Sequence, residues 1–245
     1  LKLMVSLPFL ANKRAEFSFG IGKLEDNYFQ SNVIDFEKDR SDQSMYRLLG
    51  GAIGFYGSTL NARQYATKGY YEKLIAQIFT GKEKFIPGNS PETATWKERQ
   101  SWLQISYMKE AYHTMSPKFT LGWMAEAVYS SKNFSENYTA TMMQACDFSP
   151  TPHSELMYNE AFRANQYIAA GIKPIYVLND MFQVRTEFYG FVPIFPIKKN
   201  SFNKAYYGKV FSRFEYLGEL SVVCHLPFGA ISAYVNHYSS PRKDW

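Results

Sequence analysis

The most constraining feature of this chain is a regular alternation of apolar and polar side chains along residues 210–226. The even positions are mostly apolar, as at Leu220 and Val222. Most odd positions from 209 onward are polar or charged, including Lys209, Arg213, Glu215 and Glu219. Neighbouring side chains of a strand point to opposite faces, so this pattern predicts a strand with one apolar and one charged face. At about 17 residues it is long for a soluble domain, whereas a tilted membrane-crossing strand needs about 9–11 residues and can extend further.

The same alternation recurs along the whole chain and predicts ten strands. They cover residues 1–9, 15–28, 45–58, 70–80, 100–113, 119–129, 165–178 and 181–192, a ninth strand beginning near Tyr206, and residues 229–238. Aromatic residues, which favour strands, make up 18% of the chain. We therefore predict an all-β fold in which the apolar set of each strand faces outward and the polar set faces an interior.

The predicted connections alternate between short and long. The short ones are 10–14, 60–68, 116–118, 179–180 and 227–228, and the long ones are 29–44, 81–99, 130–164 and 196–205. Short periplasmic turns at one end and long extracellular loops at the other are typical of outer-membrane β-barrels. The sequence thus predicts an antiparallel transmembrane β-barrel, located in the bacterial outer membrane.

Several other classes of protein are disfavoured by the sequence. Neither 18 consecutive apolar residues nor any hydrolase elbow, phosphate-binding loop or zinc-binding spacing is present, so we expect no spanning helix, metal or cofactor. The net charge of +5 is spread singly along the chain, which does not favour a nucleic-acid partner. Cys146 and Cys224 fit no metal spacing, and a disulfide between them is not indicated.

Residues 1–245 are expected to form one barrel domain that is truncated at both ends. The first residue is Leu1, which already belongs to an alternating segment, and no signal peptide is visible in the sequence. The carboxylates on the polar faces, including Glu187, Glu215 and Glu219, are interpreted as hydrated interior charges rather than catalytic pairs. Tyrosines and tryptophans near the predicted strand ends are interpreted as an interfacial girdle, formed by Tyr28, Tyr46, Tyr70, Trp102, Tyr129, Tyr206, Tyr207, Tyr216 and Tyr238.

Five short segments carry a resemblance to a known family. They are TLNARQY at 59–65, NYTAT at 137–141, SPTPHS at 149–154, FRAN at 162–165 and the tail 226–244. In order and spacing they resemble the C-terminal barrel of Bacteroidetes patatin-like phospholipases, which belongs to the BamA-type outer-membrane superfamily. The resemblance covers essentially all 245 residues, although no single segment is diagnostic.

The resemblance implies a 16-stranded barrel that follows a patatin hydrolase domain and a small periplasmic module, with this chain holding strands six to fifteen. The hydrolase would be absent from this chain, so the segment would do no chemistry itself. Its partners would be outer-membrane lipid and the N-terminal patatin domain of the parent chain. Its work would be to anchor that hydrolase and to help move the hydrolase or its substrate; the oligomeric state is left open.

The long loop at 130–164 is predicted to fold into the interior because its aromatic content argues against disorder. Arg163 matches the arginine of the inward sixth loop in the superfamily, but Ala164 stands where the wider pattern has glycine. The resemblance implies that this arginine pairs with an acid on a neighbouring strand. We predict Glu187 as that acid, since it lies on a polar strand face.

Two other interpretations stay open at this stage. One is an assembly or translocation barrel of the same superfamily that has no hydrolase domain. The other is a soluble β-barrel or sandwich that binds a ligand, in which case the apolar faces would form a dry core.

Overall fold

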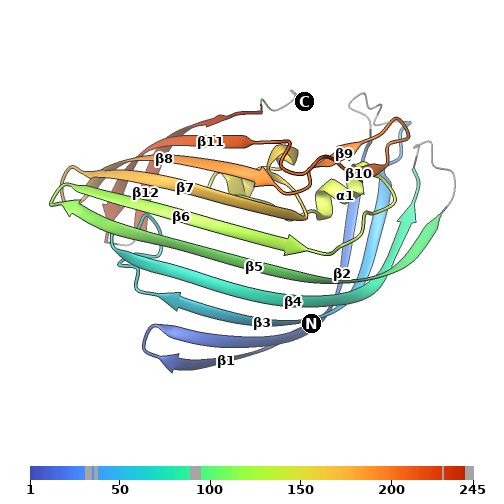
Figure 1. Ribbon diagram of the computed structural model, residues 1–245, viewed down its shortest axis with the longest axis horizontal. Helices are drawn as coiled ribbons and strands as arrows, with labels where there is room; N and C mark the ends of the chain where they lie inside the picture. Colours follow the sequence, from blue (N-terminus) through green and yellow to red (C-terminus); the bar gives the residue numbers. More distant parts are fainter. Residues whose placement is uncertain (31–34, 36–37, 89–94, 228, 241–245) are drawn as a thin grey trace.

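The computed structural model describes residues 1–30, 35, 38–88, 95–227 and 229–240. Ten strands form one antiparallel sheet: β1 (Lys2–Leu10), β2 (Lys13–Tyr28), β3 (Asp42–Ser58), β4 (Gly69–Ile86), β5 (Trp96–Ser116), β6 (Phe119–Ser130), β7 (Gln166–Val177), β8 (Phe182–Pro193), β11 (Glu215–Leu226) and β12 (Gly229–Tyr238). Each strand pairs with the next one along the chain, except that β8 pairs with β11. Between them, β9 (Ile197–Lys199) and β10 (Ala205–Tyr207) form a separate hairpin. The sheet curves around the helical segments (Figure 1).

These helical segments all lie in the connection between β6 and β7. They are α1 (Tyr138–Gln144) and two 3-10 turns, η1 (Ser154–Leu156) and η2 (Glu160–Phe162). We call the sheet face that they contact the inner face and the opposite face the outer face. No helix in the described part of the chain has the length and apolar character needed to cross a membrane.

The ten predicted strands are confirmed, with two corrections. The ninth sheet strand begins at Glu215 rather than near Tyr206, because residues 205–207 pair with β9 instead. The long connection predicted at 81–99 is also wrong over most of its length: β4 continues to Ile86 and β5 begins at Trp96. Extended pairing satisfies the backbone groups there, although polar side chains dominate the segment.

The predicted orientation of the two strand faces is confirmed. Large apolar side chains are exposed on the outer face, as for Leu3 at 68%, Ile78 at 64% and Val235 at 74%. Charged side chains on the inner face are buried, as for Arg185 at 2% and Glu187 at 6%. The dry apolar core of a soluble sandwich would require the reverse arrangement.

The aromatic girdle is corrected for part of its members. Tyr28, Tyr46 and Trp102 are buried on the inner face, where they contact the inward loop rather than an interface. Tyr129, Tyr206, Tyr207 and Tyr216 are exposed as expected. Proximity to a strand end was not sufficient to place a ring, because its position within the alternation decides which face it occupies.

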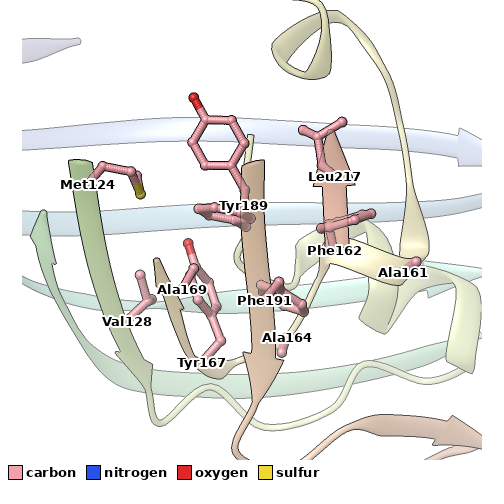
Figure 2. Close-up of a cluster of buried hydrophobic side chains, with 11 residues drawn as sticks. Met124, Val128, Ala161, Phe162, Ala164, Tyr167, Ala169, Tyr189, Phe191 and Leu217 are labelled. Atoms are coloured by element: carbon pink, nitrogen blue, oxygen red, sulfur yellow. The ribbon is translucent and has the colours of Figure 1, made fainter. Parts of the chain in front are cut away.

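A mixed cluster on the inner face holds the long loop against the sheet. Figure 2 shows loop residues Ala161, Phe162 and Ala164 beside side chains from β6, β7, β8 and β11. Phe148 of the loop stacks on Phe191 with ring centroids 5.7 Å apart. The inward folding of this loop is therefore confirmed.

Small residues on the inner face make room for aromatic rings of neighbouring strands. Gly171 is paired with Tyr189, and a Cβ at Gly171 would lie 2.3 Å from the tyrosine ring. Gly122 is paired in the same way with Tyr112, at 2.7 Å. The rings cover these glycines, which explains why bulky side chains alternate with glycine across the strands.

Candidate functional site

The long loop, residues 131–165, is anchored at its start through the cap of α1. The Asn137 side chain accepts a hydrogen bond from the Ala140 amide at 2.9 Å, as expected of an N-cap. Its amide nitrogen donates to the Tyr28 hydroxyl of β2, also at 2.9 Å. One side chain thus both starts the helix and attaches it to the sheet wall.

Lys132 is a buried cation in the same region. Its ammonium group lies 4.6 Å from the Tyr46 ring centroid and 5.0 Å from that of Trp102, and it donates to Gln144 at 3.2 Å. Burial lowers the pKa of Lys132 to about 8, although the charge of Glu83 acts in the opposite direction. The faces of the rings therefore compensate only part of the hydration that the ammonium group has lost.

Arg163 binds within the loop, and the predicted pair with Glu187 is corrected. Its guanidinium donates to the carbonyls of Met143 and Ala145 at 3.0 and 3.2 Å, where α1 ends. It also lies 3.6 Å from the Asp147 carboxylate. Free carbonyls at a helix C-terminus attract a cation, so α1 supplies the partners that the sequence pattern assigned to the wall.

Glu187 has partners on its own strand. Arg185 Nε lies 3.0 Å from Glu187 Oε1, and the Tyr189 hydroxyl donates to the other carboxylate oxygen. Residues two apart on a strand share a face, so this pair forms without any contribution from the loop. Arg163 and Glu187 both lie on the inner side of the sheet but belong to different interaction networks.

The four charged residues between 209 and 219 that were predicted to share one polar strand face lie in different surroundings. Lys209 lies in an exposed turn before β11, not on an interior strand face, because β11 begins only at Glu215. Arg213 and Glu215 pair with each other at 2.8 Å and are partly buried. Glu219 is 5% exposed and belongs to the cavity described below.

The connection between β3 and β4, residues 59–68, also folds inward. The Asn61 side chain accepts from the amides of Thr67 and Lys68, both at 3.0 Å, which closes the turn. The Tyr65 hydroxyl is 2.7 Å from the Ser232 hydroxyl of β12, 167 residues away. Arg185 donates to the Ala66 carbonyl at 3.1 Å. This turn therefore connects one part of the curved sheet to a distant part.

A polar cavity of about 430 Å³ lies between this inward turn and the tip of the long loop. The turn contributes residues 63–66 and the loop contributes residues around Thr151. The charged residues in its lining from the strands are Lys73, Glu110, Glu126, Lys173, Arg185, Glu187 and Glu219.

Most charges in the cavity wall have protein partners. Lys173 Nζ lies 2.8 Å from Glu110, and the Tyr167 hydroxyl donates to Glu126 at 2.9 Å. One oxygen of Glu219, Oε2, is buried and has no hydrogen-bond partner in the described part of the chain. Carboxylates neutralised by cations and hydroxyls favour a hydrated interior over a nucleophilic site, and the described residues contain no cluster of three or more metal-ligating side chains.

Comparison with known proteins leaves the family open. No protein-family model matches the chain, and a search of curated proteins finds no match either.

Sequence reasoning missed the role of the inward turn and of Arg185. One signal was present: the connection at 60–68 is longer than the other short connections and carries Arg63 and Tyr65. Alternation alone could not show that a turn would reach β12, because that contact depends on the curvature of the sheet.

Proposed function

We propose that this chain forms most of the wall of a transmembrane β-barrel in a bacterial outer membrane. Support comes from the antiparallel order of its strands and from the exposed apolar outer face. The connections also alternate between short and long, except that 59–68 and 87–95 are of similar length. A charged interior surrounded by an apolar exterior is the arrangement that a bilayer favours.

The decisive observation is the spacing of charge on the outer face of β2–β5. At the short-turn end, Lys13, Glu72 and Lys109 carry charge in one transverse row, in which β3 contributes the uncharged Gly57. At the long-loop end, Lys23, Arg47, Lys82 and Arg99 form a second row. We call the second one the basic row. On every one of the four strands, nine residues separate the two rows, and none of these residues carries a charge toward the outer face.

This interval matches the thickness of a membrane. Ten steps of about 3.4 Å give about 34 Å along a strand, and a tilt of about 40° reduces this to about 26 Å across the sheet. The apolar band of outer-membrane barrels is about 25 Å tall. Soluble monomers rarely expose continuous apolar patches larger than a few hundred Å², whereas here exposed apolar side chains occur on all ten strands of the sheet.

We propose further that the barrel anchors an N-terminal patatin-like hydrolase in the outer membrane. This step rests on the resemblance of residues 59–65, 137–141, 149–154 and 162–165 to that family. The segment itself is proposed to be non-catalytic, with lipid and the hydrolase domain as its partners. A sequence upstream of Leu1 that contains repeated periplasmic transport modules in place of a hydrolase would instead favour an assembly barrel.

The membrane proposal is tested by fractionation and gel mobility. The full-length protein should sediment with outer membranes, require detergent for extraction, and change its mobility on gels after boiling. Mobility that does not change with boiling, together with solubility in the absence of detergent, would contradict the proposal.

The anchoring proposal needs a separate readout. Lipid hydrolase activity should fractionate with the outer membrane in the intact protein and become soluble when residues 1–245 are deleted. Activity that remains in the membrane after this deletion would show that another segment provides the anchor.

A further inference from the structure

The basic row is electrostatically unusual for neighbouring strands. Lys23 pairs with Arg47, Arg47 with Lys82, and Lys82 with Arg99, and all four side chains are exposed. Directly paired residues of antiparallel strands share one face, with Cβ atoms about 4.5–5.5 Å apart. Like charges in this position repel each other and destabilise the sheet.

In the described part of the chain, a carboxylate neutralises only one end of the row. Lys23 pairs with Glu25, but Arg47, Lys82 and Arg99 have no ion-pair partner in the described residues. The next row toward the long loops adds Lys84 opposite Lys97, which also lack an acidic partner in this part of the chain. No carboxylate of the described residues relieves the repulsion at Arg47, Lys82 and Arg99, and a bound anion would do so.

The residues on the membrane side of the row show what kind of molecule carries that anion. One step toward the short turns, the paired residues are Ile21, Leu49, Thr80 and Ser101, and the next step contains Phe19, Gly51, Ile78 and Leu103. Along this direction the outer face changes from apolar to cationic, and on β4 and β5 the hydroxyls of Thr80 and Ser101 lie between these two zones. A ligand that matches the apolar and cationic zones is an amphiphile with an acyl tail and an anionic headgroup.

We propose that the basic row binds the phosphate groups of lipid headgroups in the leaflet on the long-loop side. This inference rests on the proposed membrane barrel. Arg47 and Arg99 can each bind phosphate through two parallel hydrogen bonds, and Lys23 and Lys82 add point charges. Four strands about 4.8 Å apart spread these cations over about 14 Å, which favours a headgroup with more than one phosphate.

The test measures lipid retained by the full-length protein in a nonionic detergent. Lipid A, which has two phosphates, is titrated and bound copies are counted by native mass spectrometry. Each basic residue near an anionic lipid surface contributes about a factor of five, so Arg47→Gln/Lys82→Gln should bind about 30-fold more weakly. The control Lys68→Gln/Lys118→Gln removes the same charge from exposed positions at the short-turn end and should bind as the natural protein does.

Three outcomes would overturn the inference: unchanged binding by the double variant, equal weakening in the control, or displacement of lipid A by millimolar inorganic phosphate. The last result would indicate a general anion site rather than a lipid site. Heat-modifiable mobility of the same samples separates the two proposals. If mobility still shifts on boiling while lipid binding is unaffected, only the headgroup site is refuted; if no shift occurs, the barrel itself is refuted.

Discussion

Neighbouring residues along a strand of this protein meet different surroundings. Ile78 is exposed on the outer face of β4, whereas Gln77 is opposite Gln104 on the inner face. Phe79, one residue further, stacks on Trp102 inside with ring centroids 5.0 Å apart. The effect of a substitution therefore depends mainly on whether the position faces the inner or the outer side of the sheet, which changes from one residue to the next.

A basic residue at position 78 should be far more damaging than one at position 77. Both sites lie midway between Glu72 and Lys82, so in the proposed membrane they are at mid-depth. Ile78→Arg should destabilise the folded barrel by about 2–4 kcal/mol, because the charge meets lipid. Gln77→Arg places the same charge in the polar interior and should cost much less. Urea titration in lipid vesicles measures the loss of stability in both variants. Equal losses would contradict the assignment of Ile78 to the outer face and Gln77 to the inner face.

Lys132 should make the stability of the inward loop depend on pH. Its pKa in the folded state, about 8, is below the ordinary value, so between the two values the open loop holds a proton that the closed loop lacks. Closure is then favoured as pH rises above about 8, by at most about 1.4 kcal/mol per pH unit. Burial raises the pKa of Cys146 to about 11. At pH values above the ordinary pKa of a cysteine, this shift disfavours closure of the loop as pH rises, opposite to the effect of Lys132.

Hydrogen exchange of residues 138–144, corrected for the intrinsic effect of pH, measures this closure. Protection should rise between pH 8 and 9 in the natural protein and stay level in Lys132→Met. A variant that shows the same rise would exclude Lys132 as the titrating group.

Elements of this molecule differ in how they are stabilised. Neighbouring sheet strands pair over 8 to 17 residues, and their register is fixed because a one-residue shift would reverse every face. By contrast, α1 has only 7 residues, fewer than an isolated helix needs. Its persistence depends on Asn137 at the start and on Arg163 at the end.

Arg163→Ala should loosen the inward loop while the sheet persists. The substitution removes the donors to Met143 and Ala145 and leaves Asp147 without its cation. Limited proteolysis should then cut within 138–163 at lower protease concentration, with unchanged heat-modifiable mobility.

Glu187→Gln is the matched control for that experiment. Because Glu187 pairs with Arg185 rather than with Arg163, this change should weaken the turn at 59–68 and leave cleavage of the long loop unchanged. Equal cleavage of the loop in both variants would instead support the pairing of Arg163 with Glu187 that the sequence predicted.

At the scale of the whole molecule, two inward segments lie on either side of the polar cavity. The turn at 59–68 reaches β12 through Tyr65 and Ser232, and the loop around Thr151 lies on the other side. Both attach to the inner face through hydrogen bonds to buried strand residues, including Arg185 and Tyr167. Two segments of the chain therefore occupy part of the inner side of the curved sheet, and the polar cavity is the compartment between them.

Shortening the turn at 59–68 should expose this compartment at one end. A thiol introduced by Ser149→Cys, in a background in which Cys146 and Cys224 are replaced by alanine, lies in the cavity wall. A charged thiol reagent should label it several-fold faster once the turn is reduced to a two-residue hairpin. Tyr65→Phe, which removes only the contact to Ser232, should give a smaller increase. Equal labelling rates in all three proteins would show that the turn does not close the cavity.

The sequence by itself determined most of the strands and their facing, because period two is a local property of an extended backbone. It also indicated that the loop at 130–164 turns inward. Only the tertiary structure decided the partners of Arg163 and Glu187 and the contact between Tyr65 and Ser232. Those partners depend on where a helix ends and how far the sheet curves, and such distances arise only when residues far apart in the chain meet.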